Sequence, residues 1–235
     1  MNELWNTLAG RAGISLSQEQ HAQLSRYLDL LLEANVRMNL TRITDRSAAE
    51  LQHVGDALTA LPLLPAGPLK LADVGTGGGV PGIPLAMVRP DAQVVLIEST
   101  RKKATFLREA VGALGLSNVT VLDVRAEDAG RDAGFRETCD VAVARAVATM
   151  DWLVEWCLPL VKKGGKMLAM KGPKVAEELP AAGKAIKLLG GAKPVVHPVD
   201  LPGTEHRVIV EITKVAKTDL RYPRIATSAK GKPIR

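Results

Sequence analysis

One stretch of this sequence, Leu69 to Leu85, restricts the possible fold more than any other. It reads LKLADVGTGGGVPGIPL: an apolar run, an acidic residue at Asp73, and a turn with glycine at positions 75, 77, 78 and 79. A tight turn from strand to helix requires positive φ, and a ligand can reach the backbone only where no Cβ intervenes. A following helix directs its free N–H groups at the same place. The stretch therefore predicts a buried strand that ends at a ligand site.

The spacing of the glycines limits which ligand fits. A Walker loop would close with Gly-Lys-Ser/Thr, whereas this turn closes with Val80, Pro81 and Gly82, so triphosphate binding is disfavoured. A dinucleotide fingerprint needs glycine at the sixth position counted from Gly75, and that position is Val80. The spacing G-x-G-x-G behind Asp73 instead resembles the first motif of Rossmann-like S-adenosylmethionine methyltransferases. A glycine-rich turn without a ligand is the alternative.

The rest of the chain alternates between strand and helix patterns, which is typical of a doubly wound parallel sheet. We expect a helix at 175–189 and further strands at 94–97, 119–122, 140–147, 166–170, 194–199 and 207–213. The predicted class is α/β. The chain divides into a helical extension (1–65), a Rossmann-like domain (66–213) and a basic tail (214–235). The last part of the tail, residues 221–235, is expected to be extended, without a core of its own.

The helical extension is predicted from caps and periodicity. Ser17 to Gln20 has the S-x-x-Q form of a capping box, and leucines at helical spacing follow it to about Met38. Ser47 to Glu50 repeats the signature before a second helix, which is ended by prolines at 62 and 65. The first 65 residues are therefore expected to lead into the sheet as a pair of amphipathic helices.

Several polar residues of this extension are not needed by a simple scaffold. Asn39 and Thr41 lie between the two helices, and His53 and Asp56 fall three apart on one face of the second helix. They are candidates for a functional role. Helix capping or a solvent-exposed position explains them equally well.

Charged residues stand at the carboxyl ends of the predicted strands, where such sheets bind ligands. Glu98 follows the second strand, where a carboxylate can accept from two ribose hydroxyls, although capping of the next helix is the alternative. Residues 123–128 leave the third strand as a loop and should lie beside an adenine. Arg145 lies in an apolar strand, where an arginine is costly unless paired, and is a site candidate, the alternative being a purely structural ion pair. Lys171 ends the fifth strand.

The positive charge is concentrated at one end of the chain. The formal net charge is +6, and from Lys214 onward seven basic residues accompany a single acidic one, so the preceding residues are balanced. Such a segment indicates contact with a polyanion, the alternative being a solvated tail without a partner. Tyr222 between Arg221 and Arg224 offers a ring on which a base can stack. Four other cations are interpreted as an ordinary solvated helix face: Arg101, Lys102, Lys103 and Arg108.

The sequence disfavours membrane and metal functions. No window contains 18 apolar residues, and the N-terminus lacks the layout of a signal peptide, so we expect a cytoplasmic protein. Cys139 and Cys157 have no metal-binding spacing and are expected to be core thiols in a reducing compartment. No metal site is predicted.

A series of short motifs, in order over nearly the whole chain, resembles the RsmG family, also called GidB. The motifs are NLTRITD (39–45), HVGDAL (53–58), DVGTGGGVPGIPL (73–85), LIES (96–99), RAED (125–128), ARA (144–146), AMKG (169–172) and RYPR (221–224). The resemblance implies a bacterial enzyme that uses S-adenosyl-L-methionine to methylate N7 of one guanine in the decoding region of 16S ribosomal RNA. The expected partner is 16S RNA or the small ribosomal subunit, and the expected state is a monomer. The ending ATSAKGKPIR departs from the usual pattern.

The resemblance also suggests roles for individual positions. The expected cofactor contacts are Gly75, Gly77, Gly79, Val80, Glu98, Ser99, Ala126, Glu127 and Arg145. The glycine turn would hold the methionine moiety, residues 98–99 the ribose and residues 126–127 the adenine. The expected RNA contacts are Lys171, Arg221, Tyr222 and Arg224.

The implied chemistry needs little from the protein. Guanine N7 has a free lone pair and no proton, so its attack on a methyl carbon requires no general base, and alignment supplies much of the acceleration. No catalytic residue is assigned. A methyltransferase with another acceptor, or a nucleotide-binding regulator without transfer activity, is the alternative. The pattern does not identify the guanine, or distinguish naked RNA from an assembled subunit.

Overall fold

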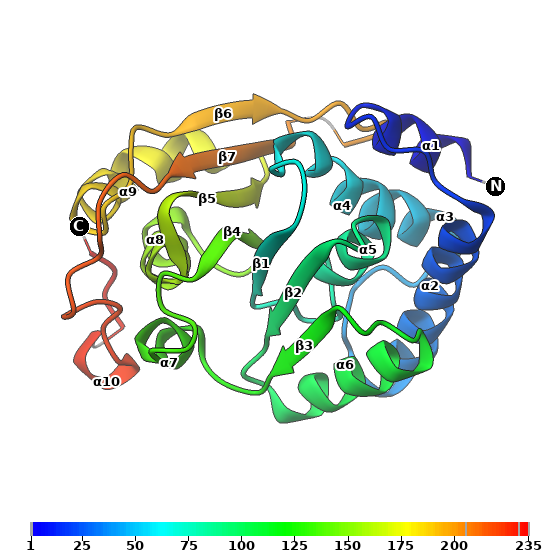
Figure 1. Ribbon diagram of the computed structural model, residues 1–235, viewed down its shortest axis with the longest axis horizontal. Helices are drawn as coiled ribbons and strands as arrows, with labels where there is room; N and C mark the ends of the chain where they lie inside the picture. Colours follow the sequence, from blue (N-terminus) through cyan, green and yellow to red (C-terminus); the bar gives the residue numbers. More distant parts are fainter. Residues whose placement is uncertain (1, 205, 230, 235) are drawn as a thin grey trace.

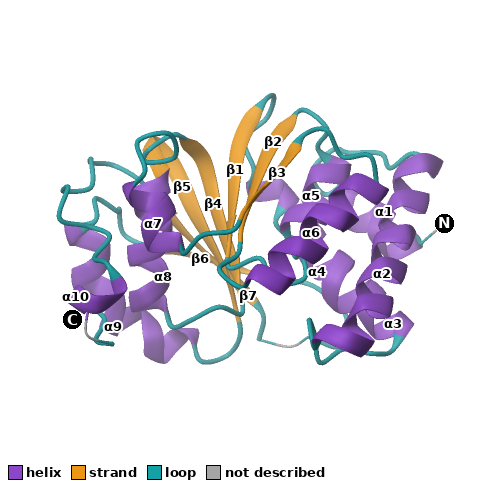
Figure 2. Ribbon diagram, turned by 90° about the horizontal axis from the view of Figure 1, so that it is seen from below, coloured by secondary structure: helices purple, strands orange, loops and turns teal. Residues whose placement is uncertain are grey.

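The computed structural model describes residues 2–204, 206–229 and 231–234. Within them, one seven-stranded sheet lies between two layers of helices (Figures 1 and 2). The strands are β1 (Leu69–Val74), β2 (Ala92–Ile97), β3 (Val119–Leu122), β4 (Cys139–Arg145), β5 (Val161–Lys171), β6 (Val195–Pro198) and β7 (Val208–Thr213). The tail cations Lys230 and Arg235 lie outside the described residues.

The order of the strands places several strand ends together. The order is β3-β2-β1-β4-β5-β7-β6, and the first five strands are parallel. Strand β7 runs antiparallel to both β5 and β6, so β7 departs from the predicted parallel arrangement. The carboxyl ends of β1 to β4 therefore meet at one edge, where a doubly wound sheet binds its ligand. The alternation of strands and helices predicted from the sequence is confirmed.

The helices are divided between the two faces of the sheet. Helices α1 to α6 cover one face and α7 to α10 the other (Figure 2). Their bounds are α1 (Glu3–Gly10), α2 (Gln18–Met38), α3 (Arg46–Ala49), α4 (Asp56–Leu58), α5 (Gly82–Val88), α6 (Arg101–Ala113), α7 (Ala126–Arg131), α8 (Met150–Cys157), α9 (Val175–Leu188) and α10 (Ala226–Ala229). Short 3-10 turns occupy Leu61–Leu63 and Leu158–Leu160. No helix in the described ranges is long and apolar enough to cross a membrane.

The helical extension belongs to the same core as the sheet. Leu24, Tyr27 and Leu28 of α2 are fully buried in one hydrophobic cluster with Leu71 of β1 and Leu96 of β2. Burial of such side chains stabilises each by about 1.5–3 kcal/mol. The extension is therefore packed onto the sheet as part of one folding unit. Both cysteines are buried and free, as predicted.

The start of the extension differs in detail from the prediction. The capping box at Ser17 is confirmed, because its hydroxyl accepts from the Gln20 N–H and the Gln20 side chain accepts from the Ser17 N–H. The second signature is displaced: Asp45, not Ser47, caps α3 by accepting from the Ala48 N–H at 2.8 Å. The chain then continues as a π-helix at Glu50–Gly55, a geometry that caps and periodicity do not specify. Helix α1 was not predicted.

The basic tail is folded against the protein. Thr218, Ala229 and Ile234 are buried, and Ile234 belongs to the hydrophobic cluster beneath α8 and α9. Two carbonyl oxygens of the tail accept hydrogen bonds from the Arg136 guanidinium, that of Thr218 at 2.7 Å and that of Tyr222 at 2.7 Å. The expectation of an extended segment at 221–235 is wrong at residues 226–229, which form the helix α10, and the buried residues of the segment pack on the rest of the protein and not in a core of their own.

Candidate functional site

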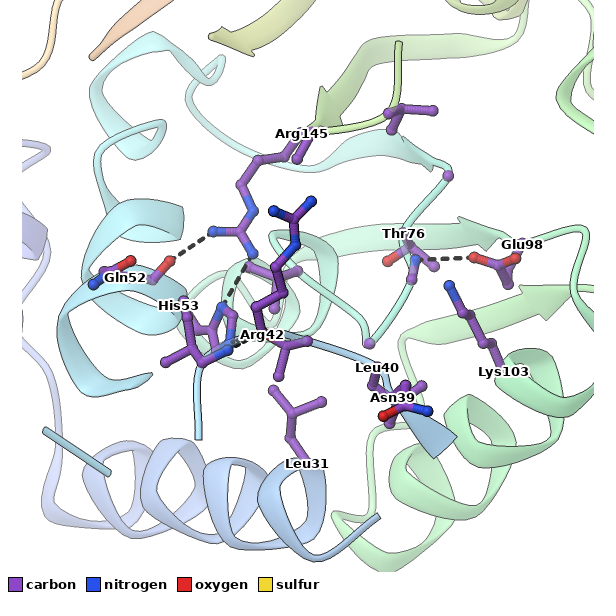
Figure 3. Close-up of a pocket in the computed structure, with 18 of the residues that line it drawn as sticks. Leu31, Asn39, Leu40, Arg42, Gln52, His53, Thr76, Glu98, Lys103 and Arg145 are labelled. Atoms are coloured by element: carbon purple, nitrogen blue, oxygen red, sulfur yellow. Dashed lines mark hydrogen bonds between the residues drawn. The ribbon is translucent and has the colours of Figure 1, made fainter. Parts of the chain in front are cut away.

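A cavity of about 970 Å³ opens where the ends of β1, β2 and β4 meet (Figure 3). Its walls come from the glycine turn after β1, from Glu98, Ser99 and Lys103 after β2, and from residues 145–147 at the end of β4. The helical extension closes the remaining side with residues 39–43 and 52–53. The sheet and the extension therefore build this cavity together.

The glycine turn is shaped by a buried carboxylate. Asp73 Oδ2 accepts hydrogen bonds from the Thr76 hydroxyl at 2.6 Å and from the Gly82 N–H at 2.8 Å, joining both ends of the turn. Burial raises the pKa of Asp73 to about 6. In the same turn, Gly75 and Gly77 have φ of +68° and +59°, which L side chains rarely adopt. The acidic residue of the motif thus holds the turn in place.

The turn presents bare backbone to the cavity. A Cβ built on Gly77 would meet no atom within 4 Å, whereas one on Gly75 would lie 2.8 Å from Val147 and one on Gly79 would lie 2.5 Å from Ile83. Gly79 therefore faces the core and does not line the cavity, and its predicted contact with a cofactor is untested. Of these three positions, Gly77 has open space where a Cβ would stand, which fits the close backbone approach that a cofactor requires.

Glu98 connects β2 to this turn. Its Oε2 accepts from the Gly77 N–H at 3.0 Å, and its Oε1 accepts from the Thr100 N–H at 2.7 Å. The carboxylate is buried yet lines the cavity. Each carboxylate oxygen retains a second lone pair for a hydroxyl donor. Both interpretations of Glu98 from the sequence, capping and ligand contact, are therefore compatible with its position.

A second, smaller cavity of about 160 Å³ adjoins the first. The two share Gly75, Ser99 and Val147 as lining residues. The smaller one is bounded by Ile97, Trp156 and the start of α7, where Ala126 and Glu127 lie. Residues 126–131 are helical, so the predicted loop after β3 ends at Arg125. A narrow space with apolar walls fits a flat aromatic ring such as adenine.

Arg145 is anchored by the helical extension. Its guanidinium donates to the Gln52 carbonyl oxygen at 2.6 Å, to Asp56 Oδ2 at 2.9 Å and to His53 Nδ1 at 3.1 Å. Arg207 donates to the same Asp56 oxygen at 2.9 Å. Burial and the nearby guanidinium groups lower the pKa of His53 to about 4, so its ring is neutral. Arg145 is thus a paired arginine that also lines the cavity.

The extension also holds the glycine turn from below. The Tyr27 hydroxyl of α2 donates to the Gly78 carbonyl oxygen at 2.8 Å, and both groups are buried. Leu31, one helical turn later, packs so closely that a Cβ on Gly78 would lie 2.7 Å from its Cδ1. Sequence reasoning missed this support, because the leucine periodicity of α2 describes a core face without showing what the core contains.

The residues expected to bind RNA line neither of these cavities. Lys171 pairs with Glu178 at 2.6 Å and Arg221 pairs with Asp219 at 3.0 Å. Arg224 pairs with the buried Glu155 at 2.6 Å, and Tyr222 packs against the cluster beneath α8. Their role in RNA binding stays a prediction. Lys103, interpreted from the sequence as part of a solvated face, is half-buried and lines the large cavity.

Solved structures with this fold are S-adenosylmethionine-dependent methyltransferases. A SAM-dependent methyltransferase from Aquifex aeolicus matches with a TM-score of 0.56 at 20% identity, covering 75% of this chain and 97% of that chain. TYW2 of M. jannaschii in complex with AdoMet matches with a TM-score of 0.52 at 18% identity, covering 73% and 77%. The fold is thus that of the Rossmann-like class I methyltransferases, with a helical extension.

Sequence comparison identifies the family. The model for rRNA small subunit methyltransferase G (GidB) matches residues 20–206. Ribosomal RNA small subunit methyltransferase G of Roseiflexus sp. (strain RS-1) is 44% identical over 234 residues, covering 100% of both chains. The protein of that name from Lactobacillus helveticus is 42% identical over 225 residues, covering 93% of each. The chain belongs to the GidB family of small-subunit rRNA methyltransferases.

Proposed function

We propose that this protein transfers the methyl group of S-adenosyl-L-methionine to N7 of a guanine in 16S ribosomal RNA. The proposal is carried by the bare backbone at Gly77, which opens into a cavity at the carboxyl ends of the parallel strands. Family membership supports the RNA acceptor, and the resemblance noted from the sequence motifs supports N7.

The two cavities match the parts of the cofactor. Gly75, Gly77 and Val80 would receive the methionine moiety in the large cavity, and Glu98 with Ser99 would receive the ribose hydroxyls. Ala126 and Glu127 would border the adenine in the small cavity. Arg145 would lie at the border between donor and acceptor. Gly79 would act through the packing of the turn.

The proposed reaction needs no general base. The lone pair of N7 forms the new bond to the methyl carbon while the sulfur–methyl bond breaks with its electron pair going to sulfur, so the positive charge passes to the guanine. Among the described residues that line the large cavity, the one histidine is His53. Both of its ring nitrogens have hydrogen-bond partners. The protein therefore contributes positioning, which is the main source of acceleration in such a transfer.

The proposal is tested by following the methyl group. Purified protein is incubated with radiolabelled S-adenosylmethionine and either protein-free 16S RNA or small subunits from a strain lacking the modification. Label should enter RNA, and strand scission specific for N7-methylguanine should map it to one nucleotide. Transfer to ribosomal protein or to a small molecule, or binding without transfer to either RNA substrate, would contradict the proposal.

The oligomeric state, the location in the cell and the form of the RNA substrate are checked in addition. We expect the enzyme to act as a monomer in the cytoplasm, which sedimentation of the active protein and fractionation of cells can check. The comparison of free RNA with subunits decides which of them is the substrate.

A further inference from the structure

The large cavity is bigger than one half of a cofactor requires. Its volume of about 970 Å³ lies at the upper end of the range for sites that hold an entire drug-sized ligand, about 300–1,000 Å³. The adenine has a separate space of about 160 Å³. Residues 39–43 and Lys103 line the large cavity next to the glycine turn, and Leu40 lies close to Gly78 (Figure 3). This part of the cavity is available to the acceptor.

The charges that line this space differ in whether they are already paired. Four cations line the cavity against one carboxylate, Glu98: Arg42, Lys103, Arg145 and Arg207. Arg145 and Arg207 both bind Asp56, so their charges are partly compensated. Arg42 and Lys103 have no ion-pair partner among the described residues. They point into the cavity from opposite sides, from the extension and from α6 (Figure 3). Two uncompensated cations at a cavity fit an anionic backbone.

Thr41, next to Arg42, has a hydroxyl whose role is fixed by its neighbours. The Arg145 guanidinium has only donors, so His53 Nδ1 accepts from it, and the neutral ring then carries its proton on Nε2. That Nε2–H donates to Thr41 Oγ1 at 3.1 Å, and the Ile43 N–H donates to the same oxygen at 3.1 Å. Both lone pairs of the Thr41 oxygen are therefore occupied. Its own O–H remains as a donor, and Thr41 lines the cavity.

We propose that residues 39–43 and Lys103 form the subsite for the acceptor nucleotide, in which Thr41 selects guanine. This inference rests on the proposed function. Arg42 and Lys103 bind the phosphates on either side of the nucleotide, and the Thr41 hydroxyl donates to guanine O6, which lies beside N7.

The hydrogen-bonding pattern of the bases explains the selection. Guanine presents two adjacent acceptors, N7 and O6, whereas adenine presents the acceptor N7 beside the N6 amino donor. A hydroxyl whose lone pairs are both occupied cannot accept from that amino group. Adenine would therefore bring two donors together, and its N7, which is equally nucleophilic in kind, would not be aligned with the methyl group. Thr41 is thus a specificity-determining residue and has no part in moving protons.

The variants Thr41→Val and Thr41→Ser test this role, because valine has the same shape without a donor and serine keeps the hydroxyl. Thr41→Val should lower kcat/KM on the guanine substrate by about tenfold, the effect of one lost hydrogen bond. Thr41→Ser should stay within about twofold of the wild type. On RNA with adenine at the mapped position, the wild type should have a kcat/KM far below its value on guanine, and the ratio of the two should be about tenfold smaller for Thr41→Val.

The cations are tested by titration of RNA at several salt concentrations. Arg42→Ala and Lys103→Ala should each weaken RNA binding and reduce the slope of log affinity against log salt by about 1. Lys102→Ala, a change to the exposed neighbouring cation outside the cavity lining, is the matched control and should leave the slope unchanged.

Failure of this inference can be told apart from failure of the proposed function. If the wild type methylates guanine N7 and Thr41→Val does so with wild-type kinetics and discrimination, the subsite is wrong while the function stands. A parallel loss of S-adenosylmethionine affinity in Thr41→Val, measured by calorimetry, would place Thr41 in the donor site and also overturn the inference. Absence of N7 methylation by the wild type contradicts the function itself.

Discussion

Two cationic regions of this molecule differ in whether their charges are already paired. One is the C-terminal tail, and the other is the mouth of the large cavity, formed by Arg42, Lys103, Arg145 and Arg207. The tail holds the excess of positive charge in the sequence, yet Lys214, Arg221 and Arg224 all have carboxylate partners. The mouth has fewer cations, and Arg42 and Lys103 have no such partner in the described part of the chain. A count of charges along a sequence thus locates basic residues without showing which of them are available to a polyanion.

A charge count fails here because the carboxylate partners of Lys214 and Arg224 lie far from them in the sequence. Lys214 is fully buried and pairs with Glu137 at 3.3 Å, and burial lowers its pKa to about 8. Arg224 binds Glu155, 69 positions earlier in the chain. Both pairs depend on tertiary packing, so Lys214 and Arg224 contribute to the fold, whereas Arg42 and Lys103 line the cavity.

The largest expected effect is at Gly77 in the glycine turn, which lines the large cavity. Gly77→Val should abolish binding of S-adenosylmethionine, because the side chain would enter the open space above the turn at a φ of +59°. Calorimetry measures the affinity. Gly67→Val is the matched control, because Gly67 also has positive φ and open space around it, but lies outside both cavities. Wild-type affinity in Gly77→Val would remove the turn from the donor site.

The free energy of unfolding, measured as a function of pH, sharpens the comparison, because the large cavity is lined by His53, a buried and neutral histidine. The folded pKa of His53, about 4, lies below its ordinary value of 6.5, so the unfolded chain binds more protons between these values. Stability from His53 is therefore complete above pH 6.5 and falls as the pH approaches 4, by up to about 3 kcal/mol. Denaturation of His53→Gln should show a correspondingly smaller loss on acidification.

Asp73 contributes a trend of opposite sign. Its raised folded pKa, about 6, stabilises the fold below the ordinary value of 3.8 and loses that effect as pH rises to 6. The wild type and His53→Gln share this contribution, so their difference isolates the histidine. Equal pH dependence in both proteins would show that His53 is not held neutral.

An effect of intermediate size is expected where the tail is anchored. Glu155→Gln keeps the shape of the side chain but removes the charge that binds Arg224, and should cost about 2 kcal/mol of folding stability. The affinity for S-adenosylmethionine should stay within about twofold. Chemical denaturation and calorimetry measure the two quantities. A loss of cofactor affinity comparable to that of Gly77→Val would show that tail and mouth are not separate regions.

The smallest effect is expected at the exposed end of the tail. Arg221→Ala removes a side chain that is 77% exposed and paired with Asp219. RNA affinity should change by less than about twofold, because the pair with Asp219 already compensates the charge of Arg221. Comparison with Arg42→Ala in the same titration decides between the two regions. A weakening by Arg221→Ala as large as that by Arg42→Ala would support the predicted role of the tail in RNA binding.

The parts of the fold that depend on neighbours in sequence could be predicted. The strand ending in the glycine turn, the capping box at Ser17 and the carboxylate at Glu98 each use residues within a few positions of one another or a position fixed by the fold. The placement of the glycine turn and Glu98 at one edge of the sheet followed from the parallel order of the strands.

The parts that depend on distant partners could not. The folded tail, the antiparallel β7 and the anchoring of Arg145 by Gln52 involve contacts between residues far apart in the chain. Thr41 and His53 were recognised as unusual, but their hydrogen bond and the resulting direction of the hydroxyl required coordinates. Lys103 was misjudged because helical periodicity does not show that the start of α6 borders a cavity.

The contact between Tyr27 and Gly78 has a consequence for how this protein could be dissected. A fragment that starts at residue 66 would keep the glycine turn but lose the hydroxyl at 2.8 Å and the leucine that hold it from below. Deletion of the first helices should therefore produce a chain that binds neither donor nor acceptor. Grafting the sheet alone onto another protein would transfer the motif without its activity.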